Sequence, residues 1–117
     1  MFLDDLRAYC LNKPHVTEDF PFDETTLVFK VDGKLFLLLD INLFEQVNVK
    51  CNPEYAIELR EQYSGIFPGY HMNKKHWNTI RMNEDVPDEL IYKLIDESYR
   101  CVISTLSKKR QYELAMG

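Results

Sequence analysis

The chain has 117 residues, of which 45% are hydrophobic and 28% are charged, and its formal net charge is −5. This length suits one domain, and the composition is that of a folded globular protein rather than a disordered chain. No apolar run approaches the roughly 20 residues that span a bilayer, and the first residues lack a secretory signal pattern, so we expect a cytoplasmic protein without a membrane partner. An acidic balance disfavours non-specific nucleic-acid binding, so any such activity has to come from a local patch.

The three cysteines, Cys10, Cys51 and Cys101, are far apart and odd in number. Without an export signal, this pattern favours reduced thiols over a disulfide framework. Cys51 precedes a predicted helix start at Pro53, where a helix N-terminus could lower the pKa of a thiol. The alternation of its strand instead points Cys51 inward, and we interpret it as a buried packing residue.

The first half of the chain predicts one helix followed by a β-hairpin. Apolar residues recur at helical spacing over 2–12, with acids in the first turn, where the helix dipole favours them. The acidic stretch 17–24 is interpreted as a loop. Two apolar runs, 26–31 and 34–39, then flank Asp32-Gly33, which is the pattern of a two-residue type I′ turn.

That turn predicts a pairing register in which Phe29 lies opposite Phe36, and Leu27 lies opposite Leu38. Both faces of the hairpin are then largely apolar. We expect both to be covered, by helices, by the aromatic loop at 20–22 or by a second subunit.

The second half predicts further strands and two more helices. The expected segments are, in order, a strand, a helix, a turn-rich connector, an extended piece, a turn, a strand and a last long helix: 46–51, 53–63, 65–69, 70–72, 73–75, 77–82 and 87–106. Lys108, Lys109 and Arg110 follow the end of that helix, where cations suit the helix dipole. The order of elements predicts an α+β fold with a mainly antiparallel sheet.

The segment 70–82 is the strongest candidate for function, because it combines cations, amides and an aromatic ring without any acid. Lys and Arg can contact phosphates, and an aromatic ring can stack on a base. The candidate residues are Asn73, Lys74, Lys75, His76, Trp77 and Arg81. On a strand, Trp77 and Arg81 share one face, which favours a binding role. The alternative is a solvated turn with Trp77 packed in the core.

A metal site has weaker support in the sequence. His71 and His76 are five residues apart and point to opposite faces of a continuous strand. The acids Glu18, Asp19, Asp23 and Glu24 could collect a cation or act as acid–base groups, or they could form a solvated loop anchored by phenylalanines. Phosphate-loop, dinucleotide-binding and serine-hydrolase motifs are absent.

Several motifs resemble the MmcQ/YjbR family of small bacterial proteins. They lie in order over almost the whole chain, at 16–22, 28–34, 48–51, 69–79 and 86–90. The run 69–79, Gly-Tyr-His-Met-Asn-Lys-Lys-His-Trp-Asn-Thr, is the most specific part. The resemblance implies a frataxin-like, CyaY-like fold, with helices on one side of an antiparallel sheet in a double-wing arrangement, and a DNA-binding role.

We therefore expect a single α+β domain over residues 1–117 that binds double-stranded DNA through the basic segment, with no catalysis and no cofactor. One alternative is a protein-interaction module, present as a monomer or weak dimer, that uses the second face of the hairpin or the strand of Trp77. Another is a small-ligand or metal-related role by analogy with frataxin-like folds.

Overall fold

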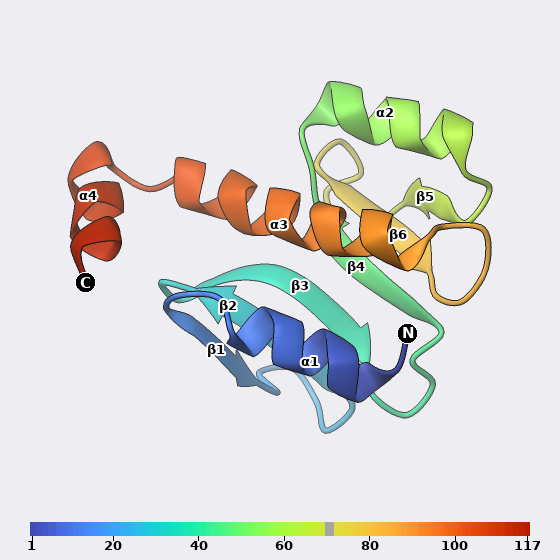
Figure 1. The fold of residues 1–117 in the computed structure, drawn as a ribbon, viewed down its shortest axis with the longest axis horizontal. Coiled ribbons are helices and arrows are strands. Elements are labelled where there is room, and N and C mark those ends of the chain that lie inside the picture. The colour runs from blue at the N-terminus through green and yellow to red at the C-terminus, as the bar shows by residue number, and fades with distance from the viewer. Residues whose placement is uncertain (70–71) are drawn as a thin grey trace.

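A computed structural model describes residues 1–69 and 72–117 (Figure 1). Its strands form one antiparallel sheet in the order β1-β2-β3-β4-β6-β5. The strands are β1 (Val16–Asp19), β2 (Thr26–Val31), β3 (Lys34–Asp40), β4 (Gln46–Lys50), β5 (Ile66–Pro68) and β6 (Trp77–Arg81). The helices are α1 (Leu3–Leu11), α2 (Pro53–Gln62), α3 (Asp88–Ser104) and α4 (Lys108–Met116). The predicted α+β class with helices on one side of an antiparallel sheet is confirmed.

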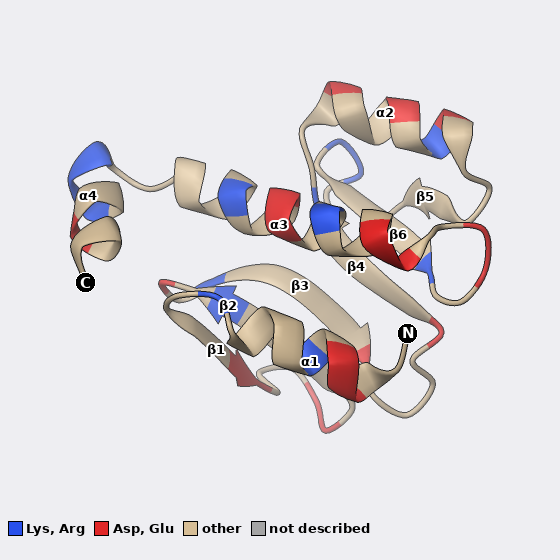
Figure 2. Ribbon diagram, in the orientation of Figure 1, with Lys and Arg blue, Asp and Glu red and all other residues tan. Residues whose placement is uncertain are grey.

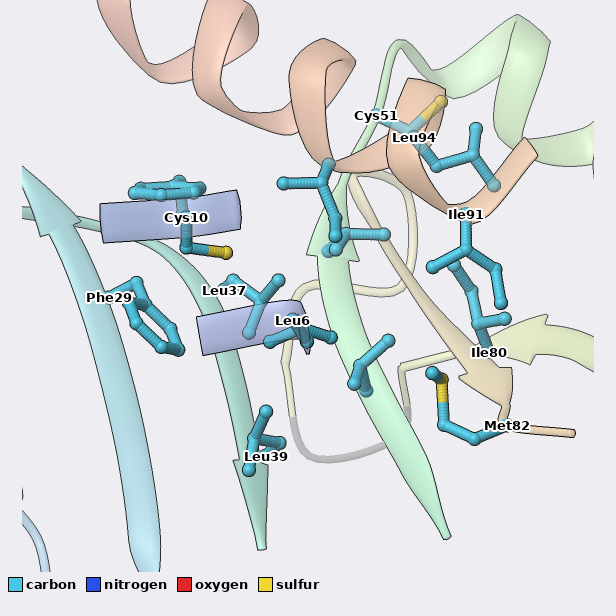
Figure 3. Close-up of a cluster of buried hydrophobic side chains, with 14 of the residues drawn as sticks. Leu6, Cys10, Phe29, Leu37, Leu39, Cys51, Ile80, Met82, Ile91 and Leu94 are labelled. Atoms are coloured by element: carbon cyan, nitrogen blue, oxygen red, sulfur yellow. The ribbon is translucent and has the colours of Figure 1, made fainter. Parts of the chain in front are cut away.

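The hydrophobic core lies between one face of the sheet and α1, α2 and α3. α3 crosses the middle strands, α1 lies along β1, and α2 lies along β5. Alternate strand residues such as Val47 and Val49 are buried on this face, and each such side chain contributes about 1.5–3 kcal/mol through burial. Figure 3 shows the packed side chains, which include Leu6, Cys10, Phe29, Leu37, Leu39, Cys51, Ile80, Met82, Ile91 and Leu94.

The β2–β3 hairpin has the predicted turn, and its register follows the prediction beside the turn but departs from it farther along the strands. Asp32 and Gly33 both have positive φ, 52° and 75°, as a type I′ turn requires. A bulge after Phe29 shifts the pairing, so that Phe29 faces Leu37 and Leu27 faces Leu39. The predicted pairs with Phe36 and Leu38 are therefore wrong.

The extra residue of the bulge is accommodated by α3. Phe36 turns into the core, and its ring packs edge-on against Tyr99, with centroids 5.6 Å apart. The buried hydroxyl of Ser98 donates to the carbonyl oxygen of Phe36 and accepts from the N–H of Lys50 at 2.7 Å. Buried backbone N–H and carbonyl groups need hydrogen-bond partners, and the bulge removes some of the partners in the sheet. The hydroxyl of Ser98 replaces them.

The acidic stretch is partly a strand rather than a loop. β1 pairs with β2, and strand alternation sends Glu18 and Asp19 to opposite faces. Glu18 pairs with Arg7 of α1, and Asp19 lies 3.6 Å from the ammonium of Lys30. The sequence prediction missed β1 because Val16 is the only apolar residue among its four, so the strand shows no apolar–polar alternation.

The loop after β1 does not cover the hairpin as predicted. Phe20 and Phe22 remain 45% and 69% exposed. In the described part of the chain, no helix packs on the face of the sheet opposite the core.

Two further elements differ from the predictions. The connector at 65–69 contains β5, a three-residue edge strand that ends at Pro68, where the absent N–H of proline is tolerated. The chain also turns after α3 and forms α4, which begins at Lys108 with Ser107 as its N-cap; the side chain of Ser107 accepts from the N–H of Arg110 at 3.1 Å. The C-terminal cations therefore follow the end of α3, as predicted, but they also form the first turn of a further helix that was not predicted.

None of the helices in residues 1–69 and 72–117 is long and apolar enough to cross a bilayer.

Candidate functional site

The basic segment forms a tight turn that leads into β6. The carbonyl oxygen of Asn73 accepts the N–H groups of His76 at 3.1 Å and Trp77 at 2.9 Å. The side-chain oxygen of Asn73 accepts the N–H of Lys75 at 2.9 Å, which is a local turn that asparagine favours. Lys74 and Lys75 are exposed at the tip. Tyr70 and His71, which belong to the predicted segment, lie outside the described residues.

Arg60 of α2 supports this turn from the side of the core. Its Nε donates to Oδ1 of Asn78 at 2.6 Å, and its Nη2 donates to the carbonyl oxygens of Lys74 and of Trp77. Asn78 is 1% exposed and itself donates to the carbonyl oxygen of Ala56. The rigid guanidinium thereby fixes the turn to α2 and β6.

Sequence analysis missed Arg60. The sequence does contain a signal for Arg60. Arg60 follows the buried Leu59 of α2, and Asn78 shares the core face of β6 with the buried Ile80. A polar residue on each of two facing apolar elements predicts a hydrogen-bonded pair between them.

Trp77 lies on the predicted strand face but is not available for stacking. The register places Trp77, Thr79 and Arg81 on the face of the sheet away from the core, as predicted. The tryptophan is nevertheless only 8% exposed. Gly69 contributes to its close packing, since its N–H donates to the carbonyl of Trp77 at 2.9 Å and a side chain at Gly69 would come within 3.1 Å of the Cβ of Trp77. The predicted stacking role of the ring is therefore wrong, because a base has almost no ring surface to contact.

Arg81 lies at the other end of β6 from the turn. Four residues of strand place it about 13 Å from Trp77. Its side chain is 53% exposed, with Glu84 at 4.0 Å and the ring of Phe67 at 5.2 Å. Arg81 is thus a cation separate from the basic turn, on the same face of the sheet as Trp77.

Two pockets border the turn, one on each side of Pro53. One, of about 520 Å³, is lined by Pro53, Ile57, Arg60, Lys74 and Lys75. The other, of about 420 Å³, lies between the turn, the end of β4 and α3, and His76 lines it. The turn therefore presents its lysines on one side and its histidine on the other.

The C-terminal cations do not extend this surface. Figure 2 shows the basic residues of α4 at the opposite end of the molecule from the basic turn beside α2. Arg110 is engaged there by Asp32, with Nη2 to Oδ1 at 2.7 Å, and by Glu113 at 3.2 Å.

Three of the four acids proposed for a cation site have structural roles, and the fourth, Glu24, is exposed. Asp23 accepts the N–H groups of Thr26 at 2.6 Å and Thr25 at 2.9 Å, and these bonds hold the pKa of its carboxyl below the usual range. Glu18 and Asp19 lie on opposite faces of β1, so they do not converge. Within 1–69 and 72–117, no group of three or more His, Cys, Asp or Glu side chains is placed to hold a metal ion.

Comparison with known proteins agrees with the motifs in the sequence. The family model described as YjbR matches residues 11–101. YjbR of Escherichia coli K12 is 32% identical over 112 residues, which is 95% of this chain and 95% of that protein. YbdF of Escherichia coli O157:H7 is 34% identical over 112 residues, or 95% of this chain and 92% of that protein.

Solved structures show the same fold. A crystal structure from Deinococcus radiodurans matches with a TM-score of 0.91 at 41% identity, covering 97% of this chain and 87% of that chain. A structure from Pseudomonas syringae matches with a TM-score of 0.73 at 28% identity, covering 86% of this chain and 98% of that chain. The sequence and structural matches extend over most of the molecule, and the chain belongs to the YjbR family.

Proposed function

We propose that this chain is a cytoplasmic protein that binds double-stranded DNA through its phosphates, without catalysis, using the basic turn 73–76 and Arg81. The observation that carries the proposal is the rigid presentation of Lys74 and Lys75. Both are exposed, and Arg60 fixes the backbone beneath them. A backbone held by hydrogen bonds loses less conformational freedom when its lysines meet a phosphate than the backbone of a mobile loop would.

The burial of Trp77 makes the proposed binding sequence-independent. Phosphate contacts position a protein on DNA but carry no sequence information, whereas bases are read at their edges. With Lys74, Lys75 and Arg81 as the contacts, about three phosphates are neutralised. The predicted slope of log K against log salt is then about −2.7.

The test is the mobility of a labelled duplex at several salt concentrations. Affinity should fall about 40-fold between about 50 and 200 mM salt. A Lys74→Ala/Lys75→Ala/Arg81→Ala variant should lose most of the affinity and most of the salt dependence. Absence of binding at about 50 mM salt and micromolar protein, or equal binding by the triple variant, would remove the proposal.

A second candidate function, self-association, is favoured by exposed apolar side chains at one end of the sheet. The β1–β2 and β3–β4 loops lie at this end, as does the start of α1. Phe2, Phe22 and Leu43 are 79%, 69% and 64% exposed there. A weak dimer of two copies would bury them. Light scattering over a range of concentrations tests this, and a monomer at every concentration would exclude it.

A further inference from the structure

The pocket on the lysine side of the basic turn has the size and the surface of a small-molecule site. It has a volume of about 520 Å³, within the range that holds organic ligands, and most of its surface is apolar. Pro53, Ile57 and Arg60 line it from α2, where their spacing places them on one face of the helix. Lys74 and Lys75 line it from the turn, which lies beside α2 (Figure 2).

An exposed isoleucine supplies much of the apolar surface. Ile57 is 53% exposed. Single exposed apolar residues are common on proteins, but this one lines a concave surface, next to the apolar ring of Pro53. An apolar group that enters the pocket removes both side chains from water, which is favourable in proportion to the area covered. The pocket therefore favours a ligand with an apolar body.

The charged residues that line the pocket are all basic. Among the described residues that form it, none is acidic. The guanidinium of Arg60 donates to the side-chain oxygen of Asn78 and to two backbone carbonyl oxygens, and all three acceptors are neutral, so these bonds leave its positive charge uncancelled. Lys75 is exposed, and no carboxylate in residues 1–69 and 72–117 lies within ion-pair distance of its ammonium. The pocket therefore favours an anion.

We propose that this pocket binds a small organic carboxylate with an apolar body, such as an arylalkanoate. The apolar body would lie on Ile57 and Pro53, and the carboxylate would accept from the ammonium of Lys75. One ammonium without an acidic partner matches a single negative charge, and the charge of Arg60 adds attraction without a direct contact. Apolar burial together with one charge-assisted hydrogen bond is the usual recognition in pockets of this size.

Occupation of the pocket would also regulate DNA binding, and this part of the inference rests on the proposed function. Lys75 is one of the three cations assigned to phosphates. A carboxylate bound to its ammonium competes with a DNA phosphate for the same charge. Loss of one phosphate contact out of about three should weaken duplex affinity several-fold.

The experiment is an NMR titration of the full chain with 3-phenylpropionate, at constant pH and ionic strength, with the neutral 3-phenylpropanamide as the matched control. The backbone amide signals of Ile57 and Lys75 should shift with the carboxylate, with a Kd in the millimolar range that its size allows. The amide should bind about fivefold more weakly, because it lacks the charge. Absence of shifts at about 10 mM carboxylate, or equal Kd values for the two ligands, would overturn the proposal.

Two pairs of variants test the assigned contacts. Lys75→Gln should raise the Kd of the carboxylate by about fivefold, whereas Lys109→Gln makes the same change in charge at the other end of the molecule and should leave Kd unchanged. Ile57→Ser should also raise Kd by about fivefold, whereas Leu43→Ser should not. Because Ile57 and Leu43 are 53% and 64% exposed, both serine variants should melt close to the native protein. Equal Kd values within either pair would overturn the assigned contacts.

The fluorescence anisotropy of a labelled duplex tests the competition. With 3-phenylpropionate at about ten times its Kd, duplex affinity should fall several-fold, and acetate at the same ionic strength should not lower it. Binding of the carboxylate without any change in duplex affinity would overturn the regulatory part of the inference. A protein that binds the carboxylate but no duplex would support the pocket and remove only the proposed DNA contact.

Discussion

Two basic runs in this chain look alike in sequence and differ in structure. Residues 73–76, Asn-Lys-Lys-His, form a turn fixed by Arg60, with pockets on both sides. Residues 108–110, Lys-Lys-Arg, form the first turn of α4, a helix that has no buried residue. The same kind of charge is thus placed on a rigid support in one case and on a weakly packed terminal helix in the other.

The difference lies in what each run is attached to. The first run precedes a strand with neighbours on both sides, and its backbone accepts hydrogen bonds from a partly buried arginine. The second places three cations at a helix N-terminus, where the dipole disfavours them, and Asp32 and Glu113 offset this for Arg110 only. A cluster of charged residues in a sequence therefore indicates a binding function only where the fold also holds the backbone of that cluster in place.

Of the changes that distinguish the two basic runs, loss of Arg60 should have the largest effect on the free energy of unfolding. Arg60→Ala removes the guanidinium donor from the buried amide oxygen of Asn78 and from the carbonyl oxygen of Lys74, whereas the carbonyl oxygen of Trp77 keeps the N–H of Gly69. Because an unsatisfied buried group costs about 1–3 kcal/mol, the free energy of unfolding should fall by about 2 kcal/mol. Urea denaturation measures it, and duplex affinity should fall as well.

Arg100→Ala is the matched control, because that arginine is 71% exposed and pairs with one carboxylate on its own helix. Its loss should change the free energy of unfolding by less than about 1 kcal/mol. Arg60→Lys should recover less than half of the loss, since lysine lacks the planar fork. If Arg60→Ala and Arg100→Ala are equally stable, the turn does not depend on Arg60.

Paired lysine variants compare the two runs directly. Lys74→Ala/Lys75→Ala should reduce the slope of log K against log salt by about 1.8 for duplex DNA. Lys108→Ala/Lys109→Ala should leave the slope unchanged and the affinity within about twofold, because α4 lies at the other end of the molecule. Both variants carry the same change in net charge. Equal losses would indicate a non-specific charge effect in place of a defined surface.

The fold was predictable where local signals were sufficient. Asp32-Gly33 specifies its turn by itself, and the alternation around Val47 and Val49 specifies a strand and its buried face. The hairpin register was not predictable, because Phe36 and Leu37 are both apolar and either one satisfies the alternation. The bulge is stabilised by Ser98, 62 residues from Phe36 in the chain.

In the candidate site, too, some features follow from local sequence and others depend on tertiary packing. The turn at Asn73 and the strand faces of β6 follow from local sequence, whereas the support by Arg60 depends on how α2 packs against β6. α4 had a local signal, the N-cap Ser107, but the cations that follow Ser107 suggested the end of a helix.

Trp77 tests whether the turn contacts phosphates alone. It is the only tryptophan in the sequence and is 8% exposed, so its fluorescence should be that of a buried ring and should not change when duplex is added. Trp77→Leu should lower the free energy of unfolding by about 2 kcal/mol through lost packing. Duplex affinity of the folded variant should stay within about twofold, whereas loss of a stacked base would cost about 1–3 kcal/mol. A clear fluorescence response to DNA, or a large loss of affinity, would restore the stacking role.

The smallest expected effect concerns α4 and depends on pH. Hydrogen bonds from Arg110 hold the pKa of Asp32 below its usual range, so the folded protein favours the carboxylate. A lowered pKa means that this contribution is present above the pKa of an unfolded aspartate, about 3.9, and is lost as the pH falls through the lower folded value. Amide protection in α4 should therefore decrease below about pH 4, while protection in β6 persists. Asp32→Asn, which tolerates the positive φ of this position, should produce the same loss at pH 7, and α4 protection that is constant from pH 7 to 3 would show that Asp32 does not hold the helix.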